Sequence, residues 1–201
     1  FSTTHVYGFP LQGGLSENTP LKAKHPYATS HKLAEDYVLE ACNNNLIKGI
    51  VLRLTNAVGP PSNKNANCWM LVSNDLCRQV ATKKIMTINA SSYLQRDFIS
   101  ISEVCRVVNR IINSSNLNSG IFNLSSGSSI SLMDLADLIS HQTEKILKYT
   151  PAIEFISQDH EPPNNYQALC ISNNKLKKYG VEINSDISFE IDNLLISCSK
   201  W

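Results

Sequence analysis

A phenol and an imidazole stand four residues apart at Tyr27 and His31. Pro26 must lie at or before the start of a helix, because its ring would clash with a preceding turn. The helical spacing of one face continues to Val38, which predicts a helix that runs to about Cys42. Side chains four residues apart are neighbours on a helix. This pair of groups suits proton transfer near a sugar or ketone oxygen.

Three hydroxyl side chains follow the first residue, at Ser2, Thr3 and Thr4. We expect them at the carboxyl end of a parallel strand that leads into a loop punctuated by glycine at Gly8. Ligands of open α/β sheets bind outside that end of the strands. The hydroxyls are therefore candidates to bind substrate oxygens. The alternative is that they only satisfy backbone groups where the strand ends.

The elements that must position these groups are read from apolar patterns. Residues 49–56 form a continuous apolar run, typical of a strand covered on both faces. Arg53 inside that run is more often a structural ion-pair partner than a catalyst. Trp69 lies in a predicted amphipathic helix from Asn65 to Ala81, either in the core or stacked on a nucleobase. Further predicted strands lie at 84–88, within 120–127 and at 152–155, and further helices lie at 104–112, after a cap at Ser129 or Ser131, within 172–180 and from 188.

Composition sets limits on the class of protein. The chain has 201 residues, 42% of them hydrophobic, with a formal net charge of +1. That is enough for a compact α/β unit with a core, and the charge favours neither nucleic acid nor an anionic membrane as a partner. No apolar run is long enough to cross a bilayer. The six cysteines lack metal-ligand spacing, so we expect no metal site and reduced, buried thiols in a cytoplasmic protein.

Several motifs together resemble one family. Tyr-Ala-Thr-Ser-His-Lys-Leu-Ala-Glu at 27–35 resembles the active-site helix of the extended short-chain dehydrogenase/reductases, the nucleotide-sugar epimerase/dehydratase family, which normally reads Tyr-Ala-x-Ser-Lys-x-x-Ala-Glu. His31 stands at the lysine position. Ser-Thr-Thr-His-Val-Tyr-Gly at 2–8, Arg-Leu-Thr-Asn-Ala-Val-Gly-Pro at 53–60 and Arg-Asp-Phe-Ile at 96–99 resemble other family motifs in the right order. The resemblance extends from Phe1 to about Ile196.

The resemblance implies a fold and a domain plan. The implied fold class is α/β: the C-terminal part of a doubly wound, Rossmann-like parallel sheet plus a small mixed α/β substrate-binding lobe. Residues 1–60 would belong to the NAD(P)-binding domain and 61–201 mainly to the substrate lobe, with 96–125 returning to the sheet. Phe1 is not a start methionine, and no Gly-x-Gly-x-x-Gly occurs. We therefore expect a C-terminal fragment of a longer protein, and a complete small domain is the alternative.

The resemblance also implies roles for single residues. Catalysis would use Thr3, Tyr27 and His31, of which Tyr27 and His31 would also contact NAD or NADP. A nucleotide-sugar substrate would be bound by Thr4, Asn56 and Arg96. Pairing with Asp97 or another carboxylate is the alternative for the Arg96 guanidinium. A homodimer through the Tyr27 helix is permitted. Residues 158–166 contain no arginine where many family members carry a second phosphate ligand, so diphosphate binding is expected to be weaker or arranged differently.

His31 changes the expected chemistry. A free tyrosine has a pKa of about 10, so acting as a base near pH 7 needs a shift of roughly 3 units, about 4 kcal/mol. The family's lysine supplies a permanent positive charge, whereas histidine is mostly neutral at pH 7. Lys32 could take the place of the family's lysine only if the helix contained a one-residue π-bulge. The intact register of Leu33 to Glu35 indicates instead that His31 substitutes for that lysine. We expect activity to rise steeply above neutral pH and His31→Lys to increase it.

Two classes of function stay open. One is an NAD(P)-dependent nucleotide-sugar epimerase or reductase in surface-polysaccharide or deoxysugar synthesis. Dehydratase chemistry is disfavoured, because Thr4-His5 stands where the sugar 4,6-dehydratases carry Asp-Glu. The other is a non-catalytic sugar-nucleotide-binding relative, or a truncated remnant. We expect these 201 residues alone to bind NAD(P) feebly and to turn over nothing.

Overall fold

The computed structural model describes residues 1–114, 116–157 and 161–201. The chain divides into two compact units, each assembled from three stretches. The first unit comprises Phe1–Thr55, Glu103–Ser129 and Gln167–Asn184, and the second comprises Asn56–Ser102, Ile130–Tyr166 and Ser185–Trp201. Both are mixed α/β with parallel strand pairs, which confirms the predicted fold class. No helix among the described residues is long and apolar enough to cross a membrane.

The first unit is built on a parallel sheet in the order β1-β3-β7 among the described residues. Its strands are β1 (Ser2–Thr3), β3 (Ile50–Leu54) and β7 (Gly120–Leu124). Val51, Leu52 and Arg53 of β3 are all buried, as a strand covered on both faces requires. A short pair, β2 (Gly14–Leu15) with β10 (Cys170–Ile171), is also parallel.

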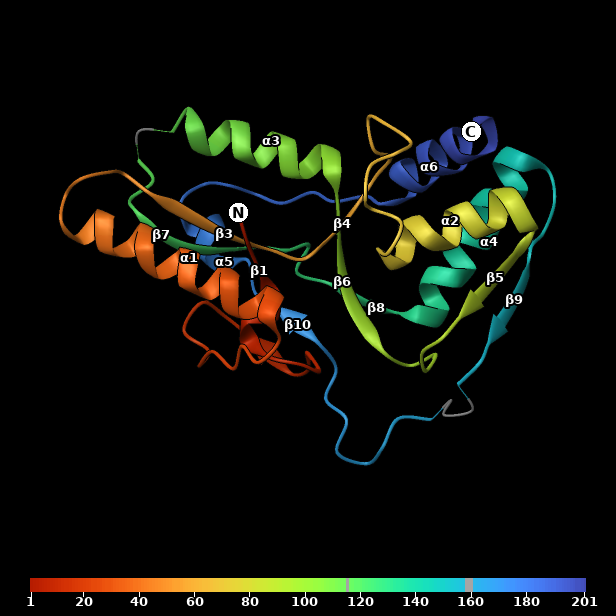
Figure 1. The fold of residues 1–201 in the computed structure, drawn as a ribbon, viewed down its shortest axis with the longest axis horizontal. Helices are drawn as coiled ribbons and strands as arrows, with labels where there is room; N and C mark the ends of the chain where they lie inside the picture. The colour runs from red at the N-terminus through yellow and green to blue at the C-terminus, as the bar shows by residue number, and fades with distance from the viewer. Residues whose placement is uncertain (115, 158–160) are drawn as a thin grey trace. The chain divides into compact units, whose positions relative to one another are not determined.

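Helices cover this sheet. Helix α1 (Pro26–Asn43) begins with Pro26 in its first turn, where a missing N–H costs nothing, and His25 caps it by accepting the Tyr27 N–H. It contacts β1, β3 and the 3-10 turn η1 (Thr4–Tyr7). Helix α3 (Ile101–Ile112) lies on the opposite side of the strands in Figure 1. The short α5 (Asn174–Lys178) packs on β7.

The second unit pairs β4 (Asn56–Val58) with β6 (Gln95–Ser100), joined by β8 (Ser129–Ser131), and pairs β5 (Ile85–Ile88) with β9 (Ala152–Phe155). From the sequence, the chain was expected to return to the first sheet at residue 96. β6 pairs with β4, and the chain re-enters the first unit only at Glu103.

Helices α2 (Val72–Lys83), α4 (Leu132–Leu147) and α6 (Ser188–Lys200) pack together in the second unit. Helix α2 begins seven residues later than the predicted Asn65, so that expectation was wrong. Turns replace the first part, because the side chain of Asn63 accepts the Asn65 N–H and the next amides bond locally. Ser131 caps α4 in a reciprocal pair with Asp134, which selects Ser131 over Ser129 as the predicted cap.

The second unit contains an apolar core cluster. Its buried members are Val58, Leu76, Cys77, Val80, Met86, Ile88, Phe98, Leu132, Leu135, Ala136, Ile139, Ile191, Leu194 and Leu195. Of the six free cysteines, Cys77 and Cys198 are buried, whereas Cys105 and Cys170 are exposed. The expectation of buried thiols was therefore right only in part, because helical spacing does not fix which face meets the core. No metal-ligand cluster occurs among the described residues.

Candidate active site

The aromatic pair on the first turns of α1 is in contact. The ring centroids of Tyr27 and His31 lie 4.6 Å apart with an interplanar angle of 70°, an edge-to-face arrangement. The contact follows from the i, i+4 spacing, as predicted. Tyr27 remains 51% exposed, so its phenol is open to a ligand.

Thr3 ends β1 and begins the η1 turn. Its hydroxyl accepts the His5 N–H at 3.2 Å, and its side chain is buried. The alternative interpretation, that strand-end hydroxyls satisfy backbone groups, is therefore observed for this residue. An accepting hydroxyl keeps its own hydrogen for donation, so Thr3 can still donate to a substrate oxygen. Thr4 is buried within η1.

His5, which was not among the predicted site residues, also lies near Tyr27. Its ring centroid lies 6.3 Å from that of Tyr27, with an interplanar angle of 70°. It is half-buried. The phenol of Tyr27 thus has imidazole neighbours from two elements, α1 and η1. The available signal was a second titratable side chain directly after the predicted strand, at the edge of the sheet where ligands bind.

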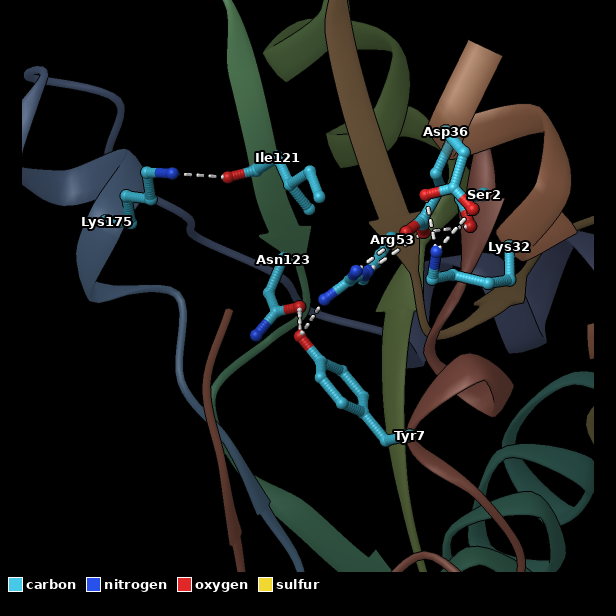
Figure 2. A network of polar contacts seen from close by, with 9 residues as sticks. Ser2, Tyr7, Lys32, Asp36, Arg53, Ile121, Asn123 and Lys175 are labelled. Carbon is cyan, nitrogen blue, oxygen red and sulfur yellow. Dashed lines mark hydrogen bonds and ion pairs between the residues drawn. The ribbon is translucent and has the colours of Figure 1, made fainter. Parts of the chain in front are cut away.

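A buried ion pair anchors α1 to the sheet beneath these rings. Arg53 donates from Nε to Glu35 Oε1 at 2.9 Å and from Nη2 to Oε2 at 2.6 Å. Ser2 Oγ donates to the same Oε1 at 2.6 Å. Figure 2 shows Arg53 reaching from β3 toward this cluster. The prediction that Arg53 is a structural ion-pair partner is confirmed, and its partner is the glutamate that closes the helix motif.

The network continues through a tyrosine. Arg53 Nη1 donates to Tyr7 Oη at 3.1 Å, and Tyr7 Oη donates to Asn123 Oδ1 at 2.6 Å (Figure 2). Burial raises the pKa of Tyr7, although Arg53 opposes the shift. Burial by itself would lower the pKa of Arg53, but its hydrogen bonds to Glu35 and Tyr7 raise it. Both groups therefore hold their protons and serve structure.

Arg96 lies in the second unit and lines a cavity of about 310 Å³. Burial lowers the pKa of its guanidinium. Among the described residues it forms no ion pair with Asp97 or any other carboxylate, so the alternative of an Asp97 pair is not observed. A desolvated guanidinium on a cavity wall favours an anionic ligand.

Trp69 shares this cavity with Arg96. It is half-buried and does not belong to the apolar core. Its indole N–H donates to the Lys64 carbonyl at 3.1 Å, and the guanidinium of Arg78 lies 5.0 Å from its ring centroid. Asn56, at the start of β4, donates its side-chain amide to the Asp97 carbonyl at 2.9 Å.

The structure thus places the predicted residues in two groups. Thr3, Thr4, Tyr27 and His31 belong to the first unit, and Asn56 and Arg96 belong to the second. Of the segment 158–166, residues 158–160 lie outside the described residues. Tyr166 accepts the Gln95 N–H with its hydroxyl at 3.1 Å.

Residues 1–125 match the family model described as the NAD dependent epimerase/dehydratase family. The chain belongs to this family. The match includes β1, α1, β3 and the Arg96 segment, which are the motifs that carry the resemblance. Helix α1, with Tyr27 and His31, lies inside the matched residues.

Two of the relatives of this epimerase/dehydratase chain are named as UDP-sugar epimerases. An Arabidopsis thaliana protein named as UDP-arabinose 4-epimerase 2 is 34% identical over 58 residues, which are 29% of this chain and 14% of that protein. A UDP-glucuronic acid 4-epimerase from Bacillus cereus, solved with NAD, superposes with a TM-score of 0.79 at 19% identity over 99% of this chain and 58% of its own. RMD from Pseudomonas aeruginosa, solved with NADPH, superposes with a TM-score of 0.78 at 18% identity, over 99% of this chain and 64% of its own.

These structural likenesses support the fold of the epimerase/dehydratase family. The chain spans about three fifths of the length of the solved structures it matches, 58% and 64% for the two named above. At 18–19% identity they show the arrangement of the elements and not the reaction.

Proposed function

We propose that this chain supplies the acid–base helix and part of the sugar-nucleotide site of an NAD(P)-dependent nucleotide-sugar epimerase or reductase, in surface-polysaccharide or deoxysugar synthesis. The observation that carries the proposal is the half-exposed phenol of Tyr27, packed against His31 on α1. A cytoplasmic location would suit six free thiols.

The first unit's residues have defined tasks in this proposal. Tyr27 exchanges a proton with a sugar hydroxyl or ketone oxygen, and Thr3 donates a hydrogen bond to that oxygen. Tyr27 and His31 fit a contact with the nicotinamide end of NAD(P), because both side chains are accessible beside the carboxyl end of β1. NAD(P), when bound, accepts or returns the hydride of the sugar carbon. His31 orients the phenol without supplying a permanent charge.

The second unit's residues would bind the nucleotide. Arg96, which forms no ion pair with a carboxylate among the described residues, offers its guanidinium on a cavity wall to a diphosphate. Asn56 of the same unit, positioned by its bond to the Asp97 carbonyl, is a further proposed substrate contact. Thr4 is a proposed substrate contact of the first unit. On this proposal the first unit lies on the NAD(P) side of the enzyme and the second unit is its substrate lobe.

A homodimer through α1 is part of the proposal. Leu33 is 55% exposed and Tyr37 is 66% exposed on this helix, and such apolar surface favours association. Size-exclusion chromatography with light scattering tests it, with Tyr37→Glu expected to give a monomer. A wild-type monomer at micromolar concentration would contradict the dimer.

The function is tested with the full-length protein, NAD or NADP, and a set of UDP-sugars. Turnover or cofactor reduction, followed by reduced-nicotinamide absorbance and by product chromatography, is expected for one sugar. Tyr27→Phe should lower kcat by about 100-fold or more, because it removes the proton-exchanging hydroxyl. His141→Gln, an exposed histidine on α4, is the matched control and should leave activity unchanged.

The second candidate is a sugar-nucleotide-binding protein without catalysis, and the observation that favours it is His31 in place of the lysine. Calorimetry with UDP separates the two. Binding that is weakened about tenfold or more by Arg96→Met, together with no cofactor reduction, would establish the binding protein. Absence of both binding and turnover would refute both candidates.

A further inference from the structure

We infer that Tyr166 is a positioning residue, which keeps the guanidinium of Arg96 turned toward the cavity of the second unit, where it binds a diphosphate. The inference rests on the proposed function, in which Arg96 binds the diphosphate of a sugar nucleotide. Residues 158–166 contain no arginine. On this inference the segment contributes to diphosphate binding through a tyrosine that acts on Arg96.

The hydroxyl of Tyr166 is bonded to the backbone just before Arg96. It accepts the Gln95 N–H at 3.1 Å and donates to the Tyr93 carbonyl at 3.3 Å. The rings of Tyr93 and Tyr166 also pack edge to face, with centroids 5.2 Å apart and an interplanar angle of 81°. All four residues belong to the second unit. One side chain thus fixes the backbone that leads into Arg96.

This part of β6 lies outside the register with β4. Strand β4 begins at Asn56, which stands opposite Phe98 of β6. The Tyr166 hydroxyl therefore takes the Gln95 amide two residues before Asp97 without a β4 residue opposite it. The direction of a side chain in a strand is set by its backbone, and successive side chains point to opposite faces. A twist of the backbone at Gln95 would turn Arg96 away from the cavity.

The segment that carries Tyr166 is itself restrained. Its backbone N–H donates to the Pro163 carbonyl at 2.8 Å, which closes a turn. Pro162 and Pro163 precede this turn, and the proline ring fixes the φ angle of each. A hydroxyl on a restrained segment can hold a neighbouring strand in place, because it has little freedom to move with it.

Arg96 depends on such support from its surroundings. It lines the cavity of about 310 Å³, and among the described residues no carboxylate forms an ion pair with it. Burial lowers the pKa of its guanidinium, and the nearby Tyr166 partly opposes that shift. A side chain that is already oriented loses less conformational freedom when a ligand binds. Fixing its backbone therefore favours binding of a diphosphate.

Tyr166 acts through Arg96 and not as a phosphate ligand. A phenol carries a single hydrogen, and here that hydrogen is donated to the Tyr93 carbonyl. Phosphate oxygens are bound by hydrogen-bond donors, and the guanidinium of Arg96 supplies several. Among the described residues, the cavity wall includes Arg96 and not Tyr166.

The first test is a double-mutant cycle in the full-length protein, measured by calorimetry with UDP. Tyr166→Phe should raise the Kd for UDP by about 3- to 10-fold, because the hydroxyl that holds the backbone before Arg96 is lost. In an Arg96→Met background the same change should raise the Kd by less than about twofold, since the side chain that it positions is absent. Equal fold changes in the two backgrounds would overturn the inference.

Tyr149→Phe is the matched control. The Tyr149 hydroxyl donates to the Val80 carbonyl at 2.7 Å in the same unit, and Tyr149 is not among the described residues of the cavity wall. This variant should lose a comparable hydrogen bond, as urea unfolding measures, and keep the wild-type Kd for UDP. A Kd raised as much as in Tyr166→Phe would show a role in stability alone and would overturn the inference.

The second test follows the Arg96 side chain without any ligand. Its Nε–Hε signal in nuclear magnetic resonance is assigned by its absence from Arg96→Met. Tyr166→Phe should move or broaden this signal, because the guanidinium samples more orientations, and Tyr149→Phe should leave it unchanged. A signal that is identical in wild type and Tyr166→Phe would overturn the positioning role.

The outcomes separate this role from the proposed function. If UDP binds and Arg96→Met weakens its binding while Tyr166→Phe does not, the positioning role is refuted and the function stands. If wild type does not bind UDP, the proposed substrate site is refuted, and with it a role of Tyr166 in substrate binding, whatever the resonance result.

Discussion

Both units bury apolar and polar side chains, but they differ in the contacts that join the buried groups. In the first unit, a network of hydrogen bonds and one ion pair joins the buried residues Ser2, Tyr7, Glu35, Arg53 and Asn123. In the second unit, the packed interior is a continuous apolar cluster from β4, β5, β6, α2, α4 and α6. Hydrogen bonds are directional and apolar burial is not. The polar network of the first unit thus fixes the orientation of the side chains that it joins, and the apolar cluster of the second unit stabilises that unit.

Their helices show the same contrast. Within α1, all of which the structure describes, the buried side chains are Ala28 and Glu35. Helix α4 instead buries Leu132, Leu135, Ala136, Ile139, Gln142 and Thr143. Helix α1 is therefore held by the buried Glu35 and by half-buried side chains such as Val38 and Cys42, and leaves Leu33 and Tyr37 exposed.

The largest expected effect comes from breaking the polar anchor. Glu35→Gln should lower the free energy of unfolding by about 3–5 kcal/mol, because Arg53 is left buried without a counter-charge. Urea unfolding followed by circular dichroism measures it. Glu35→Leu with Arg53→Met should cost less than either single change. Lys32→Gln, in the exposed pair with Asp36, is the control at about 0.5 kcal/mol or less. A cost below about 1 kcal/mol for Glu35→Gln would remove the contrast.

A comparable but smaller loss is expected in the apolar unit. Leu135→Ala should cost about 3 kcal/mol, because it opens a cavity in a core where its side chain is fully buried. Met133 on the same helix is 39% exposed, so Met133→Ala should cost well under 1 kcal/mol. The same unfolding experiment compares them. Equal losses would show that this core relaxes around the deletion.

Alkaline pH should lower the stability of the second unit. Burial raises the pKa of Cys198 to about 11 and also raises the pKa of Cys77. A raised pKa contributes stability below the unfolded value, near 9, that is lost as pH rises toward the folded value. Wild type should therefore lose up to about 2 kcal/mol more than Cys198→Ala between roughly pH 8 and 10.5. Cys105→Ala removes an exposed thiol and should lose stability with pH as wild type does. If the free energy of unfolding of Cys198→Ala fell with pH as steeply as that of wild type, the prediction would be contradicted.

The smallest expected effect is a loss of stability in the first unit at acid pH. Burial by itself would raise the pKa of Glu103, but hydrogen bonds from Arg106 and the Asn184 N–H hold it below its usual value. A lowered pKa gives stability that is present above the unfolded value and lost as pH falls through the folded one. Below about pH 4.5, Glu103→Gln should therefore lose less of its free energy of unfolding than wild type does, by about 1 kcal/mol or less. Unchanged acid unfolding would show that other carboxylates dominate.

Local pattern predicted most helices and strands. The helix expected from Pro26 to about Cys42 ends at Asn43, and the strands expected within 49–56 and at 84–88 are β3 and β5. The late start of α2 was missed, because asparagine side chains and local amide bonds in the turns outweigh a helical spacing that began at Asn65. Apolar periodicity shows which residues would share one face of a helix, but it does not show where turns replace that helix.

The candidate site was predictable to the extent that its geometry is local. The contact of Tyr27 with His31 follows from the pitch of one helix. The contact of Tyr27 with His5 depends on how η1 and α1 pack, and no spacing in the chain encodes it. The structure also leaves Arg96 without an acidic partner among the described residues, although Asp97 is its neighbour in sequence.

The sequence by itself determined where α1 begins, that Tyr27 and His31 meet, and that Arg53 in an apolar strand needs a counter-charge. Covalent geometry and the cost of burying charge suffice for these conclusions. Only the tertiary structure decided that Glu35, 18 residues away, is that partner, and that Tyr7 bonds to Asn123 across 116 residues. Such contacts depend on which faces of separate elements pack together, and packing is a property of the whole unit.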